Sequence, residues 1–276
     1  MNLEQANRLI EKASSAITET FPSKGQYRVG VDLGTAYIVL VVIDENDNPV
    51  AVELEFAQVL KDGLVVDYMG ACDIVRRLKG KLEERLGETL LHAAIAIPPG
   101  TTEKDTKTHQ YVVESAGLEV CNIVDEPTAA NAVIGMKNGV IVDIGGGTTG
   151  LSILKDGQVV FVVDEATGGT HVSLVLSGHF KVDFQEAEAI KKDPKRQKDV
   201  THIVRPVFEK MAEIVAQNIE GHRADEICLV GGTCLLPDVE KIFEKRTSIK
   251  TCKPDQPLLA TPLGIALNCF PQGGDE

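Results

Sequence analysis

The stretch that decides the fold is Gly139-Val140-Ile141-Val142-Asp143-Ile144-Gly145-Gly146-Gly147-Thr148-Thr149-Gly150-Leu151-Ser152-Ile153-Leu154. An apolar run carries one aspartate, breaks on three glycines and resumes as a second β-prone run, which predicts a strand, a tight turn and another strand. Because glycines lack a Cβ, backbone N–H groups of this turn can surround an anion, and Thr148 and Thr149 add hydroxyl donors. Asp143 stands where a carboxylate can hold the magnesium that accompanies a polyphosphate. The stretch predicts a phosphate-binding turn, although a Gly-rich turn alone also fits an ordinary hairpin.

A partial copy of this stretch occurs earlier in the chain, at residues 28–35. Asp32 aligns with Asp143 at an offset of 111 residues, and three flanking pairs then align as well: Val31 with Val142, Leu33 with Ile144, and Gly34 with Gly145. Each copy continues as a strand, a polar turn and another strand, which predicts that both halves begin with a three-stranded meander. Two such halves facing each other would bring two strand-end aspartates and two phosphate-binding turns to one cleft.

The composition sets limits on the class of protein. The chain has 276 residues, a net charge of −13 and a pI near 5.0. Gly-punctuated strands alternating with helical patterns predict two α/β lobes. The acidic balance opposes binding to nucleic acid or to an anionic membrane, since both need a basic surface. No apolar run approaches the roughly 20 residues that span a bilayer, so we expect a cytoplasmic protein with neither partner.

The six cysteines form no CxxC pair, and several lie in apolar runs. This pattern favours reduced thiols in the core over disulfides or a metal site.

We expect four segments along the chain. Residues 1–24 hold an N-terminal amphipathic helix, residues 25–138 the first lobe, residues 139–260 the second lobe, and residues 261–276 a closing helix and tail that return to the first lobe. The first helix has its apolar residues at spacings of three and four. It either packs on its own domain or docks on a partner.

Three further features can contribute to a phosphate site. Glu126 precedes Pro127 at a predicted helix start, where the helix dipole keeps a carboxylate ionised. It is either a helix-start residue or a group that orients an attacking water. Gly168 and Gly169 open another helix whose N–H groups can face phosphate. A third glycine turn, Gly231-Gly232-Thr233, follows a predicted strand.

Five segments resemble, in order, the motifs of the actin-like ATPase superfamily, which includes actins, sugar kinases and the DnaK-type heat-shock chaperones. They are residues 29–37 and 142–150 (two phosphate loops), 125–130 and 261–267 (two connecting helices), and 227–237 (an adenosine loop). The residues of these motifs are most similar to those of the chaperone branch. With its short length, the chain resembles the ethanolamine-utilisation EutJ family of chaperone-like ATPases. The resemblance implies an α/β fold, the duplicated actin-like ATPase (ribonuclease H-like) fold, with two lobes around a nucleotide cleft.

The resemblance also implies roles for particular residues, with ATP or ADP and Mg as ligands. Asp32 and Asp143 would hold Mg through water, and Glu126 would orient the hydrolytic water. Together with Thr148 these three form the implied catalytic set. The implied phosphate-binding residues are Gly34, Thr35, Ala36, Gly145, Gly146, Gly147, Thr149, Gly168 and Gly169. The implied adenosine-binding residues are Glu188, Lys191, Gly231, Gly232 and Thr233.

The chain also departs from the chaperone pattern. Gly150 stands where the chaperones carry a further Asp, and Leu235 replaces their adenine-stacking Arg, so we expect slow turnover. The segment before Ile95 is too short for the usual inserted subdomain, and no counterpart of the chaperones' phosphate-contacting Lys can be assigned in it. We also expect no peptide-binding domain.

Three functions remain open at this point. The first is an ATP-binding, slowly hydrolysing, chaperone-like protein that remodels, reactivates or helps assemble a partner enzyme of ethanolamine utilisation. The second is a nucleotide-regulated structural or assembly protein associated with a bacterial microcompartment. The third is a small-molecule kinase, for which we find neither a catalytic Asp beside the γ-phosphate nor the longer lobes. For the first two, the resemblance implies a protein partner, either an ethanolamine-utilisation enzyme or a microcompartment component, and a cytoplasmic place with microcompartment association.

Overall fold

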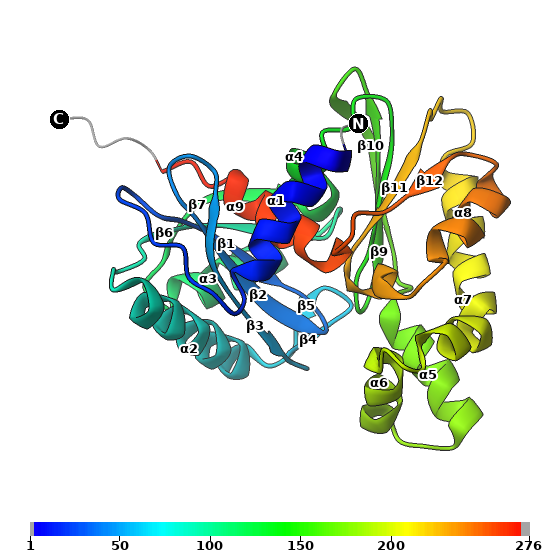
Figure 1. Ribbon diagram of the computed structural model, residues 1–276, viewed down its shortest axis with the longest axis horizontal. Helices are drawn as coiled ribbons and strands as arrows, with labels where there is room; N and C mark the ends of the chain where they lie inside the picture. Colours follow the sequence, from blue (N-terminus) through cyan, green and yellow to red (C-terminus); the bar gives the residue numbers. More distant parts are fainter. Residues whose placement is uncertain (1–2, 272–276) are drawn as a thin grey trace.

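The computed structural model describes residues 3–271 and contains two five-stranded sheets (Figure 1). The first sheet has the order β3-β2-β1-β6-β7. Its strands are β1 (Arg28–Leu33), β2 (Tyr37–Ile43), β3 (Pro49–Phe56), β6 (His92–Ile97) and β7 (Glu119–Asp125). β1, β2 and β3 pair antiparallel, whereas β6 and β7 are parallel to β1.

The second sheet repeats this topology in the order β10-β9-β8-β11-β12. Its strands are β8 (Gly139–Ile144), β9 (Thr149–Lys155), β10 (Gln158–Glu165), β11 (Ile227–Val230) and β12 (Thr251–Cys252). β8, β9 and β10 again pair antiparallel, and β11 and β12 run parallel to β8. The predicted meander at the start of each half is therefore confirmed, and Asp32 and Asp143 take equivalent places in the two sheets.

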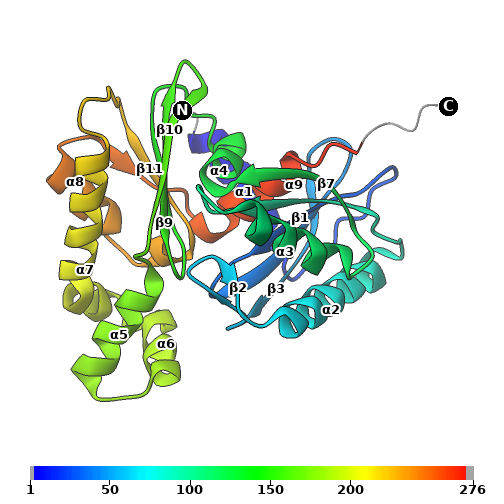
Figure 2. The same ribbon diagram turned by 180° about the vertical axis from the view of Figure 1, so that it is seen from behind.

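Helices cover the outer face of each sheet (Figures 1 and 2). On the first sheet these are α2 (Tyr68–Leu86), which packs on β2 and β3, and α3 (Glu103–Glu114), which packs on β6 and β7. The Asp67 side chain accepts from Gly70 N–H at the start of α2, and Gly87 ends the helix in the left-handed region. On the second lobe α7 (Gln197–Asn218) and α8 (Val239–Thr247) lie beside the sheet, whereas α5 (Gly169–Phe180) and α6 (Phe184–Lys192) pack against each other and α7 beyond one end of it.

Two helices cross between the sheets, α4 (Glu126–Ile134) and α9 (Ala260–Leu267) (Figure 1). They meet at Gly264, where a Cβ would overlap the carbonyl of Ala129. The predicted closing helix therefore packs closely against α4 and the first sheet. Because each crossing helix starts beside a strand end, this contact sets the distance between the two lobes at the base of the cleft.

The N-terminal helix, α1 (Leu3–Ser15), buries Ala6, Ile10 and Ala13 in the core between the lobes. Asn7 Oδ1 accepts from the backbone N–H of Asp255 at 3.1 Å, which ties the helix to the end of the chain. Of the two alternatives for this helix, the structure therefore shows the one in which it packs on its own protein.

The sequence analysis missed the shortest elements. These are the hairpin of β4 (Leu60–Lys61) and β5 (Leu64–Val65), the two-residue strand β12, and the 3-10 helices η1 (Gly232–Leu235) and η2 (Pro257–Leu259). A hairpin with two-residue strands has no periodicity to detect. Among residues 3–271, no helix has both the length and the apolar character needed to cross a bilayer.

Candidate functional site

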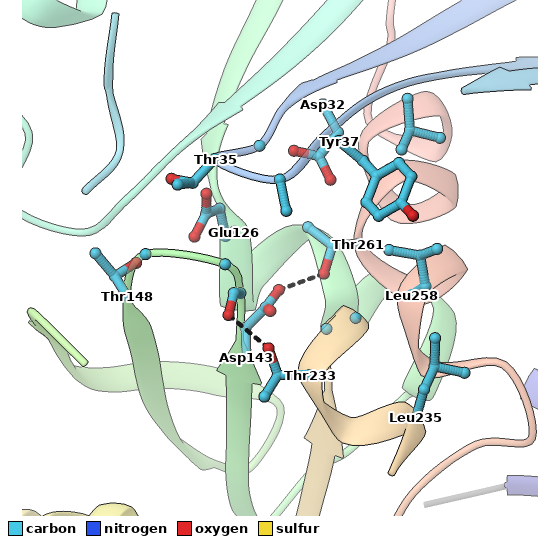
Figure 3. Close-up of a pocket in the computed structure, with 18 of the residues that line it drawn as sticks. Asp32, Thr35, Tyr37, Glu126, Asp143, Thr148, Thr233, Leu235, Leu258 and Thr261 are labelled. Atoms are coloured by element: carbon cyan, nitrogen blue, oxygen red, sulfur yellow. Dashed lines mark hydrogen bonds between the residues drawn. The ribbon is translucent and has the colours of Figure 1, made fainter. Parts of the chain in front are cut away.

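A cleft between the two lobes gathers residues from both halves of the chain (Figure 3). Asp32 reaches it from β1, Asp143 from β8, and Glu126 from the first residue of α4. Figure 3 shows Asp32 and Asp143 on facing sides of the same space, with Glu126, Thr35 and Thr148 together at one flank of it. The predicted meeting of the two strand-end aspartates in one cleft is what the structure shows.

Burial raises the pKa of all three carboxylates, and repulsion between charges adds to the shift at Asp32 and Glu126. Burial, and then the negative charge of Asp143, raise the pKa of Asp32 to about 7. Burial raises the pKa of Asp143 to about 6, although a hydrogen bond from Thr261 opposes the shift. Burial and the charges of Asp143 and Asp32 also raise the pKa of Glu126 well above its ordinary value. A cation bound through water would relieve this repulsion. Among residues 3–271, no group of three or more His, Cys, Asp or Glu side chains is arranged to ligate a metal directly.

The two phosphate loops touch each other across the cleft, and glycine is needed where they do. A Cβ on Gly146 would lie 2.9 Å from the Cβ of Ala36, and one on Gly147 would lie 2.9 Å from the Cα of Asp62. Asp62 and Gly63 form the tip of the β4–β5 hairpin, and Gly63 N–H lies 3.4 Å from Thr35 Oγ1. The short hairpin thus covers one end of the cleft, and backbone N–H groups line it.

The third glycine turn supports Asp143. Gly231 has φ of 90°, and a side chain there would clash with the Asp143 carboxylate. Thr233 Oγ1 donates to the carbonyl of Gly145 at 2.8 Å, so this turn also holds the second phosphate loop. Thr261, at the start of α9, donates to Asp143 Oδ2 at 2.5 Å. Both hydrogen bonds are drawn in Figure 3.

Most of the predicted site residues line the cleft. From the phosphate and catalytic sets these are Asp32, Gly34, Thr35, Ala36, Glu126, Asp143, Gly145, Gly146, Gly147 and Thr148, and from the adenosine set Glu188, Lys191, Gly231, Gly232 and Thr233.

Three predicted phosphate-binding residues do not line the cleft. The Thr149 side chain is buried, and its hydroxyl donates to the carbonyl of Thr167 at 2.6 Å. Gly168 packs against the backbone of the second phosphate loop, and Gly169 N–H donates to the carbonyl of Gly145 at 2.9 Å. The first N–H groups of α5 are therefore used to support this loop from behind, and the prediction that they face phosphate is corrected.

Glu188 and Lys191 form a buried ion pair on α6, at the side of the cleft. Lys191 Nζ donates to Ser173 Oγ at 2.8 Å, and Ser173 in turn donates to Glu188. Burial acts to raise the pKa of Glu188, but the charges of Lys191 and Lys192 together with hydrogen bonds from Lys191 and Ser173 outweigh it, and the pKa is lowered. The pair is fixed on the second lobe, with both side chains at the cleft surface.

The opposite end of the cleft is apolar and, besides Leu235, is formed by residues that were not assigned to the site from the sequence. Leu235, Leu236 and Leu258 line it together with Tyr37 (Figure 3). Lys192 Nζ, from the second lobe, lies 4.8 Å from the centre of the Tyr37 ring and 3.9 Å from that of Phe56. Tyr37 is the last residue of the first phosphate-loop segment, and Lys192 directly follows Lys191, so both could have been found from the sequence. Leu258 carried no signal.

Comparison with known proteins identifies the family. A family model described as Hsp70 protein matches residues 41–218. Ethanolamine utilization protein EutJ of Salmonella typhimurium is 44% identical over 259 residues, which are 93% of this chain and 91% of that protein. The chain belongs to the EutJ family. The resemblance drawn from the five sequence motifs is confirmed.

Solved structures agree with this assignment. The crystal structure of EutJ from Carboxydothermus hydrogenoformans superposes with a TM-score of 0.93 at 47% identity, covering 97% of this chain and 99% of that one. MreB5 of Spiroplasma citri bound to AMPPNP gives a TM-score of 0.71 at 18% identity, covering 88% and 95%, and shares the fold alone. EutJ family members thus have the predicted fold, that of the actin-like ATPases.

Proposed function

We propose that this EutJ family member binds ATP with magnesium between its lobes, hydrolyses it slowly, and uses the change in lobe position to remodel, reactivate or help assemble a partner enzyme of ethanolamine utilisation. The observation that carries the proposal is the convergence of two strand-end aspartates, Glu126 and three glycine turns in one cleft. The Hsp70 match supports a nucleotide as the ligand. The relatives named for ethanolamine utilisation support a partner from that process.

Different parts of the cleft bind different parts of the nucleotide. Backbone N–H groups of the loops around Gly34 and Gly146 bind the phosphates, and the hydroxyl of Thr35 adds a donor. The apolar end at Leu235 and Leu258 receives the base. Asp32 and Asp143 would hold magnesium through water, and the ion when bound neutralises charge on the phosphates.

Glu126 activates the water. Its carboxylate accepts a hydrogen bond from the attacking water and orients it toward the γ-phosphorus. Because burial and the neighbouring aspartates raise the pKa of Glu126, its ionised form is a stronger base than an exposed glutamate. Positioning and charge neutralisation suffice for this reaction, so no covalent nucleophile is needed.

Substitution of Glu126 by Gln tests both the chemistry and the partner. The amide keeps the size of the side chain but accepts a proton poorly, so we expect ATP hydrolysis to fall by about 100-fold while ATP affinity is retained. Hydrolysis is measured as phosphate release in single turnover, and affinity by calorimetry. An unchanged rate in Glu126→Gln would contradict the proposed role.

The same variant serves as bait for the partner. Because it would hold ATP without hydrolysing it, Glu126→Gln should retain an ethanolamine-utilisation enzyme from a lysate in the presence of ATP more strongly than in its absence. Wild-type protein with ATP and the variant without nucleotide are the controls. Recovery that is equal in all nucleotide states would contradict a nucleotide-driven action on a partner.

A further inference from the structure

A fourth carboxylate lies in the same row of the second sheet as Asp143. Asp143 on β8 pairs directly with Gly150 on β9, and Gly150 pairs directly with Asp164 on β10. Directly paired residues place their side chains on the same face of a sheet, with neighbouring strands about 4.8 Å apart. Asp143 and Asp164 therefore face one another across a residue that has no side chain.

The space above Gly150 is occupied by Asp164 and by the first turn of α4. A Cβ on Gly150 would lie 3.6 Å from Asp164 Oδ1 and 3.4 Å from Pro127 Cγ. Pro127 follows Glu126 directly, so the Asp164 carboxylate leans toward the turn that carries the proposed base. Electrostatic repulsion between Asp164 and Glu126 is consistent with this placement.

The two oxygens of Asp164 differ in their surroundings. The Thr148 hydroxyl interacts with the carboxylate and partly offsets the rise in the pKa of Asp164 that burial causes. Oδ1 is buried and has no hydrogen-bond partner within residues 3–271. A buried carboxylate oxygen without a partner costs stability. No backbone N–H within residues 3–271 donates to this oxygen, so holding the local fold does not account for an acid at this position.

We propose that Asp164 is a positioning residue for ATP hydrolysis, acting through Thr148 to orient the attacking water. By accepting the hydroxyl proton of Thr148, Asp164 leaves the Thr148 oxygen free to accept a hydrogen bond. An attacking water whose two hydrogens are accepted, one by Glu126 and one by Thr148, presents its lone pair to the phosphorus. This inference rests on the proposed ATP hydrolysis.

Substitution of Asp164 by Ala tests the role. We expect kcat for ATP hydrolysis to fall by about tenfold or more, while the Kd for Mg-ATP changes by less than about twofold, since Asp164 acts on the water and not on the nucleotide. Gln158→Ala, an exposed change on the same strand, is the matched control and should keep the wild-type kcat.

The double variant Gly150→Asp/Asp164→Ala separates positioning from a structural role. It returns a carboxylate to the same row from the opposing strand, so kcat should recover in large part over Asp164→Ala. A kcat in Asp164→Ala equal to wild type, or no recovery in the double variant, would overturn the inference alone. Absence of hydrolysis in the wild-type protein would overturn the proposed function, and this inference with it.

Discussion

At the scale of single residues, the cleft concentrates acids that oppose one another. Burial is the first cause of a raised pKa at Asp32, Glu126, Asp143 and Asp164, and repulsion between them adds to it at three of the four. Such an arrangement lowers the stability of the protein without its ligand, and it is suited to cation and phosphate chemistry. The conflict between stability and function can be measured.

Asp32→Asn should stabilise the magnesium-free protein at neutral pH. The pKa of Asp32 rises from 3.8 to about 7 on folding. Between these values the folded state binds more protons than the unfolded state, so stability falls as pH rises through this window. Removing the charge should therefore raise the free energy of unfolding by on the order of 2 kcal/mol at pH 8 and by little at pH 4.

Urea unfolding in EDTA at the two pH values measures this difference. Asp156→Asn, in the exposed turn between β9 and β10, is the control and should leave stability unchanged at both. The same gain at pH 4 as at pH 8, or no gain at either, would argue against the ionic origin of the effect.

Sequence spacing predicted the residues whose neighbours along the chain define them. Asp32 and Asp143 each end an apolar run before a glycine turn, and Glu126 precedes a helix-starting proline. Asp164 could not be found in this way, because its proximity to Gly150 comes from the pairing register of β9 with β10. Thr149 was predicted to bind phosphate, but side chains alternate between the two faces of a strand, and its hydroxyl points away from the cleft to the carbonyl of Thr167.

At the scale of elements, the crossing of α4 and α9 holds the two lobes together. A helix interior normally gains stability when Gly is replaced by Ala, by up to about 1 kcal/mol. Gly264 is an exception, since a Cβ there would overlap a backbone carbonyl of α4 that side-chain rotation cannot move away. The two helices can approach this closely only with glycine at the contact.

Gly264→Ala should therefore lower the free energy of unfolding by about 2 to 4 kcal/mol through overpacking and displaced backbone. Gly80→Ala, on the exposed side of α2 with no atom within 4 Å of the added Cβ, is the matched control and should stabilise the protein. Thermal and urea unfolding measure both variants. Equal effects of the two substitutions would show that the crossing tolerates a methyl group.

Long periodic elements were predicted well because periodicity and capping residues agree. In α2 both signals are present, with a side-chain cap at Asp67 and a left-handed Gly87 at its ends. The β4–β5 hairpin was missed although it covers the phosphate loops. Its position depends on contacts of Gly63 with Thr35, which no local pattern encodes.

At the scale of the whole molecule, the duplicated sheets make a cleft whose two sides belong to different lobes. Gly146 of the second lobe meets Ala36 of the first, and Lys192 of the second lobe lies over Phe56 of the first. A ligand that contacts both loops would therefore favour one relative position of the lobes. The internal repeat in the sequence predicted this two-sided cleft. The apolar end of the cleft could not be predicted, because it depends on how loops distant in the sequence pack together.

The central claim is that Mg-ATP binds between the two phosphate loops, and calorimetry tests it directly. Titration of Mg-ATP into the wild-type protein should give saturable heat with a stoichiometry near one, and EDTA should weaken the binding. Gly146→Val, which would force its side chain against Ala36, should abolish the heat while the protein remains folded. No heat with the wild-type protein, or unchanged binding by Gly146→Val, would contradict the account.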